Sequence, residues 1–100
     1  MKPINIINKL SEEHTIDEVV KEIPKGISDA LVKDHSIGDT VYFYHGASDF
    51  SDASKIIGYI IVERQKTAYY ALKWPDGYIG IGADDCCFGE NKMNRYLDEF

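Results

Sequence analysis

Short runs of alternating side chains, separated by turn-forming residues, constrain the fold of this chain more than any other feature. The runs lie at residues 41–44, 56–64, 67–74 and 78–83. Alternation places successive side chains on opposite faces of a strand, and consecutive strands with short links pair as antiparallel neighbours. A Pro-Asp-Gly turn at 75–77 separates the last two runs. The sequence therefore predicts a four-stranded antiparallel meander or small barrel over residues 37–84.

The first third of the chain has helical rather than alternating periodicity. Thr15 is followed three residues later by Glu18, which is the capping box that satisfies free N–H groups at a helix start. Pro24 ends the apolar run that follows. Ser28 is a candidate N-cap for another helix. We predict three N-terminal helices, over residues 15–23, 4–10 and 28–34.

A loop and a C-terminal helix complete the predicted fold. The segment 45–55 is rich in Ser, Asp and Gly and has no periodicity, which is typical of a loop. Residues 90–100 carry apolar side chains at the spacing of one helix face, namely Met93, Tyr96, Leu97 and Phe100. We expect an α+β fold in one domain, 1–100, made of a helical part (1–36), a sheet (37–84) and a C-terminal helix (90–100).

The composition is that of an acidic globular domain. One hundred residues suit one domain, and a hydrophobic content of 44% is well above that of disordered chains. The 17 acidic and 11 basic side chains give a formal net charge of −6. Nucleic acid is disfavoured as a partner, because Lys and Arg supply the affinity for phosphate backbones. A basic protein is favoured, because opposite fields attract.

Neither a membrane segment nor a disulfide is expected. No run reaches the ~18 apolar residues that a membrane span needs, and residues 1–4 lack the apolar region of a signal peptide. We therefore expect a cytoplasmic protein. Cys86 and Cys87 are adjacent, and Cα atoms ~3.8 Å apart are too close for an ordinary disulfide. Two reduced thiols are the predicted state.

Tyrosines alternate with the predicted core positions along the strands. On the third strand, four side chains are predicted to face the core: Ala68, Tyr70, Leu72 and Trp74. The opposite faces and the nearby acids form a candidate partner-binding surface of Tyr42, Tyr44, Tyr59, Tyr69, Tyr78, Asp76, Asp84 and Asp85. Tyrosine suits an interface, because its ring buries much area and its hydroxyl stays polar. The alternative is that the helices cover this face and make the tyrosines a second core layer.

The residues that could carry catalysis or hold a metal form incomplete sets. One thiol of the pair 86–87 could act as a nucleophile with His35 or His45 as its base, but no family signature flanks the pair. Asp84 and Asp85 are metal ligands by type, yet neighbours on an extended chain point apart and no further pair completes a tetrahedral set. We predict no catalytic residue, no metal site and no cofactor.

Three motifs follow one another in the predicted sheet: I-G-D-T-V-Y-F-Y, then I-I-G-Y-I-I-V-E-R, then T-A-Y-Y-A-L-K-W-P-D-G. Together they resemble the small barrels of the Tudor and KOW type, in which a G-D-x-V strand precedes a G-x-I strand and a Y-x-V-x-W-x-D-G hairpin. The resemblance covers Ile37 to Asp84, about half of the chain. It implies a small barrel and the general class of a binding module for proteins, peptides or nucleic acids. The helical first third, the 45–55 loop and the lack of basic charge depart from that pattern.

Charge, aromatic content and the missing catalytic set favour one function. We expect a non-enzymatic protein-binding module, of the inhibitor or immunity type, that presents an acidic, tyrosine-rich surface to a basic partner such as a nuclease. One alternative is a nucleic-acid-associated small-barrel domain. The other is a thiol- or metal-dependent enzyme that uses Cys86 and Cys87.

Overall fold

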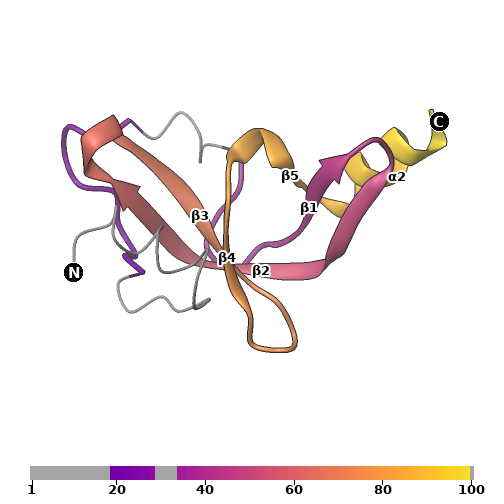
Figure 1. The fold of residues 1–100 in the computed structure, drawn as a ribbon, viewed down its shortest axis with the longest axis horizontal. Coiled ribbons are helices and arrows are strands. Elements are labelled where there is room, and N and C mark those ends of the chain that lie inside the picture. The colour runs from indigo at the N-terminus through magenta and orange to yellow at the C-terminus, as the bar shows by residue number, and fades with distance from the viewer. Residues whose placement is uncertain (1–18, 29–33, 100) are drawn as a thin grey trace.

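Five antiparallel strands and a C-terminal helix make up the part of the protein that the structure describes. The computed structural model describes residues 19–28 and 34–99. The strands form one sheet in the order β4-β3-β2-β1-β5 (Figure 1). The α+β class is confirmed, with five strands in place of four. In chain order the elements are β1 (Thr40–Gly46), β2 (Asp49–Val62), the 3₁₀ helix η2 (Glu63–Gln65), β3 (Thr67–Lys73), β4 (Ile79–Gly82), the 3₁₀ helix η3 (Asp84–Cys86), β5 (Cys87–Phe88) and α2 (Glu90–Asp98).

Strand β2 is much longer than the sequence predicts. Its 14 residues include most of the segment 45–55, so the predicted loop is wrong. Residues 49–55 pair with β1 in antiparallel register. The Ser54 hydroxyl donates to the Val41 carbonyl oxygen at 2.9 Å, and both residues are buried. Pairing with β1 therefore outweighs the weak strand propensity of Ser and Asp.

A β-bulge in the middle of β2 exchanges the faces of the strand. The register with β3 shifts between Ile56 and Gly58, which leaves Ile57 as the extra residue. Strict alternation would place Ile56 and Ile60 on one face. Instead, Tyr59 packs against the cluster that contains Ile56, whereas Ile60 belongs to a separate cluster. The sheet therefore has apolar side chains on both faces at this point.

Strand β3 follows the sequence prediction closely. The strand predicted over residues 67–74 is observed as β3, and its inward-facing Ala68, Tyr70 and Leu72 are 0% exposed. Trp74 follows β3 directly and is half-buried, packing against the cluster that contains Tyr70 and Leu72. The predicted core is thus confirmed for three of the four residues, and Trp74 lies at its border.

The sheet is open among the described strands, because β4 and β5 occupy its two edges and do not pair with each other. The closed-barrel alternative is therefore wrong. Ala83 and η3 lead the chain from one edge to the other, where β5 pairs with β1. The edges approach each other closely: a Cβ atom at Gly82 would lie 2.8 Å from the Cys87 sulfur. Sequence analysis missed β5, because two residues are too few to show a period.

The described residues before β1, 19–28 and 34–39, form bends, turns and isolated β-bridges and contain no helix. Val20 forms an antiparallel bridge to Tyr59 of β2, with N–H···O distances of 2.8 and 3.0 Å. The described end of the helix predicted over 15–23 is therefore wrong. Gly58 permits the bridge, because a Cβ atom there would lie 2.6 Å from the Val20 carbonyl oxygen.

Only the two ends of the helix predicted over 28–34 are described, and neither Ser28 nor Asp34 is helical. The Ser28 N–H donates to the Lys66 carbonyl oxygen at 2.8 Å, in a parallel bridge to Thr67, so the backbone of Ser28 joins the sheet edge. Its N-cap role involves residues outside the described ranges and stays a prediction. The rest of that helix up to residue 33, the helix predicted over 4–10 and the capping box at 15–18 lie outside the described residues.

The C-terminal helix is confirmed as α2, which packs on the hairpin of β1 and β2 (Figure 1). Met93 and Tyr96 are half-buried, whereas Leu97 is 37% exposed and does not share the predicted buried face. Phe100 lies outside the described residues. Tyr96 closes a cluster of rings whose centroids are 5.0 to 5.8 Å apart, formed by Tyr44, Phe50, Phe88 and Tyr96.

Candidate functional site

The hairpin of β3 and β4 ends in a turn that holds the Trp74 and Tyr78 rings together. The Trp74 carbonyl oxygen accepts the Gly77 N–H at 2.9 Å, and the Trp74 N–H donates to the Tyr78 carbonyl oxygen at 2.9 Å. Pro75 supplies the fixed φ of the second turn position, and Gly77 adopts a φ of +92°. The Asp76 carboxylate accepts the Tyr78 N–H at 2.9 Å. The predicted Pro-Asp-Gly turn is confirmed.

A hollow beside this turn, which we call the acidic notch, has a volume of about 240 Å³. Its lining consists of Asp52, Trp74, Pro75, Asp76 and Tyr78. The ring centroids of Trp74 and Tyr78 are 5.6 Å apart, and Tyr78 is 39% exposed. The Trp74 indole N–H donates to the Asp52 carbonyl oxygen at 3.1 Å, which fixes the ring against β2. The acidic notch thus lies between β2 and the turn.

Negative charge and aromatic faces dominate the acidic notch. Asp52 and Asp76 are both exposed, and neither carboxylate has an ion-pair partner within residues 19–28 and 34–99. The lining contains no Lys, Arg or His. Aromatic faces carry the negative side of the ring quadrupole and attract cations. The arrangement is therefore suited to a basic side chain of another molecule.

The structure does not gather the predicted tyrosines on one surface. Tyr78 and Asp76 lie together in the acidic notch. The other predicted tyrosines are half-buried and lie in different places: Tyr42 beside β5, Tyr44 under α2, Tyr59 against the core and Tyr69 over η2. Tyr78 is exposed, as the binding-surface prediction requires, whereas α2 packs against Tyr44, as the alternative requires.

Asp84 is buried, so its predicted place on a partner-binding surface is wrong. Asp84 is 8% exposed. Its carboxylate accepts hydrogen bonds from the Tyr70 hydroxyl at 2.6 Å and from the Asp34 N–H at 3.3 Å. Burial acts to raise the pKa of Asp84, but these hydrogen bonds outweigh it and hold the pKa below its ordinary value. Asp85, the next residue, is exposed.

Tyr70 and Asp84 belong to a buried network that includes His35. The Tyr70 hydroxyl also accepts the His35 N–H at 3.0 Å. Burial is the main cause that raises the pKa of Tyr70, and the hydrogen bond to Asp84 raises it further. The His35 Nε2 atom lies 2.9 Å from the Cys87 carbonyl oxygen. The network therefore ties the segment that precedes β1 to β3, η3 and β5.

The thiols of Cys86 and Cys87 are held in their unreactive form. Burial raises the pKa of Cys87 to about 12, and burial together with the charge of Asp85 raises the pKa of Cys86. Because the thiolate is the nucleophile, both shifts oppose catalysis by these residues. His35 contacts a backbone oxygen and not a thiol. Within the described part of the chain, no group of three or more His, Cys, Asp or Glu could hold a metal ion.

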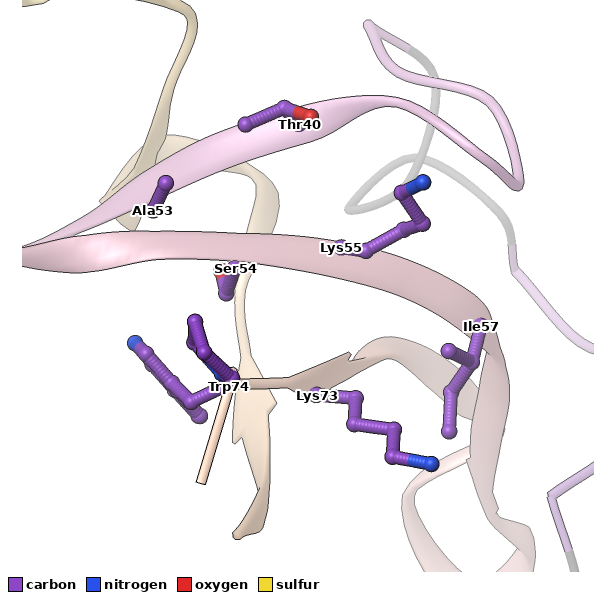
Figure 2. A pocket seen from close by; sticks show the side chains of 8 residues that line it. Thr40, Ala53, Ser54, Lys55, Ile57, Lys73 and Trp74 are labelled. Carbon is purple, nitrogen blue, oxygen red and sulfur yellow. The ribbon is translucent and has the colours of Figure 1, made fainter. Parts of the chain in front are cut away.

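A second cavity, which we call the basic groove, shares Trp74 and Pro75 with the acidic notch. It has a volume of about 350 Å³ and is lined by Thr40, Ala53, Ser54, Lys55, Ile57, Lys73, Trp74 and Pro75 (Figure 2). Lys55 of β2 and Lys73 of β3 are direct Cα partners across the ladder. Figure 2 shows the Lys73 side chain extending toward Ile57 and away from Trp74. Sequence analysis missed this lysine pair, because neither strand alone reveals the register.

Comparison of the chain with family models, with curated proteins and with solved structures finds no match in any of the three. Within the described residues, no helix has the length and apolar character needed to cross a membrane. A functional assignment must therefore start from the two cavities that meet at Trp74.

Proposed function

We propose that the protein is a non-enzymatic protein-binding module that receives a basic side chain of its partner in the acidic notch. The observation that carries this proposal is a single cavity lined by the rings of Trp74 and Tyr78 and by the carboxylates of Asp52 and Asp76, neither of which forms an ion pair within the described residues. A cation over an exposed ring gains about 0.5–1 kcal/mol, and an exposed ion pair gains about 0.2–1 kcal/mol. Lysine and arginine make both contacts at once.

The charge of the whole chain favours a basic partner. A net charge of −6 steers basic proteins toward the surface and repels polyanions. An inhibitor or immunity-type role follows from the same argument, because a basic enzyme such as a nuclease exposes the side chains that the acidic notch takes. Pro75 and the indole hydrogen bond to β2 hold the notch in shape before binding, which lowers the ordering cost.

The resemblance to Tudor and KOW barrels supports the same class of function. The motifs that carry the resemblance lie on β1, on β2 and on the hairpin of β3 and β4, in the order that those barrels have. Trp74 and Asp76 of the third motif line the acidic notch. The resemblance does not extend to barrel closure, because the sheet of the described residues is open.

A pair of charge-matched variants tests the proposed function. Asp52→Asn with Asp76→Asn removes the charge of the acidic notch and keeps its shape, whereas Asp49→Asn with Asp98→Asn removes the same charge at exposed sites outside the notch. Each immobilised protein captures partners from an extract of the source cells, and mass spectrometry quantifies what is retained.

We expect basic proteins to be retained by the wild type and by the control variant. Loss of both carboxylates should weaken capture by up to roughly tenfold, since two exposed ion pairs together contribute about 0.4–2 kcal/mol and about 1.4 kcal/mol corresponds to a factor of ten. Equal capture of the same proteins by the notch variant and the control would refute the proposed function.

A further inference from the structure

Lys55 of β2 and Lys73 of β3 are cross-strand neighbours whose side chains extend in different directions (Figure 2). The two residues are Cα partners, both side chains are exposed, and neither forms an ion pair in the described ranges 19–28 and 34–99. Like charges directly opposite on antiparallel strands repel and destabilise the pair. An anion seated in the basic groove would convert this repulsion into attraction.

The basic groove has the size and the lining of a binding site. Small-ligand sites have volumes of roughly 300–1,000 Å³ and combine apolar walls with a few charged groups. Here Trp74, Pro75 and Ile57 supply the apolar wall, and the two lysines supply the charge. The remaining lining is uncharged, so among the residues that line the groove nothing neutralises the lysines.

The basic groove and the acidic notch adjoin each other, because Trp74 and Pro75 line both. A ligand that filled both cavities would carry a positive and a negative group a short distance apart. In an extended peptide, side chains two residues apart point to the same side, about 7 Å from each other. That separation is comparable with the span of one indole ring.

We propose that the basic groove binds an acidic side chain of the same partner segment whose basic side chain occupies the acidic notch. This inference rests on the proposed function, because it takes the partner to be a protein. The segment that the site selects has Arg or Lys and Asp or Glu separated by one residue. A single carboxylate suits the groove better than a nucleic acid, whose many phosphates would meet a surface of net charge −6.

Three end-blocked peptides of equal length test the inference in NMR titrations of the ¹⁵N-labelled full chain. The first contains Arg and Glu with one Gly between them, the second replaces its Glu by Gln, and the third replaces its Arg by Gln. We expect the first peptide to shift the amide signals of Asp76, Tyr78, Lys55 and Lys73. The second peptide should leave Lys55 and Lys73 unshifted and bind about fivefold more weakly, which is the upper range for one exposed ion pair.

A double variant separates the basic groove from the acidic notch. Lys55→Gln with Lys73→Gln removes both charges and keeps two polar, flexible side chains that are each one atom shorter. We expect this variant to bind the Arg-Glu peptide about as weakly as the wild type binds the Arg-Gln peptide. The control, Lys25→Gln with Lys92→Gln, changes two exposed lysines that do not line the groove and should bind like the wild type.

Each outcome bears on a different part of the inference. Equal affinity of the wild type for the Arg-Glu and Arg-Gln peptides would overturn the acidic-side-chain site and leave the acidic notch standing. Unshifted Asp76 and Tyr78 signals with both Arg peptides would refute the proposed function and, with it, the paired occupancy. A short single-stranded oligothymidylate that shifts Lys55 and Lys73 more strongly than the Arg-Glu peptide does would overturn the choice of a carboxylate in favour of nucleic acid.

Discussion

Replacement of Tyr70 by Phe tests whether the buried network of Tyr70, Asp84 and His35 holds the fold together. The Tyr70 side chain is 0% exposed, and its hydroxyl donates to Asp84 at 2.6 Å and accepts the His35 N–H at 3.0 Å. Phe fills the same space apart from one oxygen atom. The expected change therefore comes from the hydrogen bonds and not from a large cavity.

The expected loss in the free energy of unfolding follows from the hydrogen bonds that Asp84 and His35 lose. A hydrogen bond to a charged group contributes about 1.5–3 kcal/mol, and a backbone N–H left without its acceptor costs about 1 kcal/mol more. Asp84 is buried, so water does not readily replace the lost donor. We expect the free energy of unfolding to fall by about 3 kcal/mol. With a urea m-value of roughly 2 kcal/mol/M, the midpoint shifts by about 1.5 M.

The matched control is Tyr69→Phe, which removes the same atom from the preceding residue. The Tyr69 hydroxyl donates to Gln65 at 3.3 Å on the exposed surface, so its loss should change the free energy of unfolding by no more than about 0.5 kcal/mol. Urea unfolding followed by Trp74 fluorescence measures both variants. If Tyr70→Phe lowered the midpoint no more than Tyr69→Phe does, the network would have no energetic role and the reasoning would fail.

Tyr70→Phe should also change how the free energy of unfolding depends on pH in acid. The pKa of Asp84 is lowered in the folded state, so its contribution is present above the unfolded pKa of about 3.9 and is lost as pH falls through the folded pKa. We expect the urea midpoint of the wild type to decrease as the pH is lowered below about 4. Loss of the Tyr70 hydroxyl removes a cause of the lowered pKa, so the drop in Tyr70→Phe should be smaller. Identical pH profiles would contradict this account.

Two further predictions concern the sheet edge and the thiols. Gly58→Ala places a methyl carbon about 2.6 Å from the Val20 carbonyl oxygen, so we expect faster hydrogen exchange at the Tyr59 amide, and unchanged protection would argue against the bridge. Burial holds the pKa of Cys87 near 12 and raises that of Cys86, so both thiols of the folded protein should react with iodoacetamide at about pH 8 much more slowly than those of the urea-unfolded chain. Equal alkylation rates, read by mass spectrometry, would show that the thiols are accessible as thiolates.

Strand pattern and turn chemistry could be read from the sequence, but the bulge in β2 could not. Ala68, Tyr70 and Leu72 alternate and are buried as predicted, because the extra residue of the bulge lies on β2 and leaves the alternation along β3 unbroken. In β2 the extra residue at Ile57 reverses the alternation. A bulge arises from pairing with the neighbouring strand, so the pattern of one strand does not reveal it.

The error at the N-terminal segment has a similar cause. Val19, Val20 and Ile23 have the spacing of a helix face, yet β-branched side chains suit an extended segment equally well. Gly58 decides between the two, because the missing side chain lets Val20 reach the backbone of Tyr59. A glycine inside a predicted strand was the signal for this close approach.

The candidate site was predictable only where it is local in sequence. The turn at 75–77 brings Asp76 and Tyr78 together by short-range geometry. Asp52, by contrast, reaches the acidic notch from β2, and Asp84 is withdrawn from the surface by Tyr70. Both placements depend on contacts between segments that are distant along the chain, which composition and spacing do not encode.

Strand β2 changes partners along its length, pairing with β1 up to Lys55 and with β3 from Lys55 onward. The two hairpins extend in opposite directions from this shared strand (Figure 1). A break at the turn formed by residues 47 and 48 would leave β2 whole. A break at Ile57 would cut β2 itself, the strand with which both β1 and β3 pair. In a split-protein experiment, fragments divided at the turn should therefore reassemble, and fragments divided at the bulge should not.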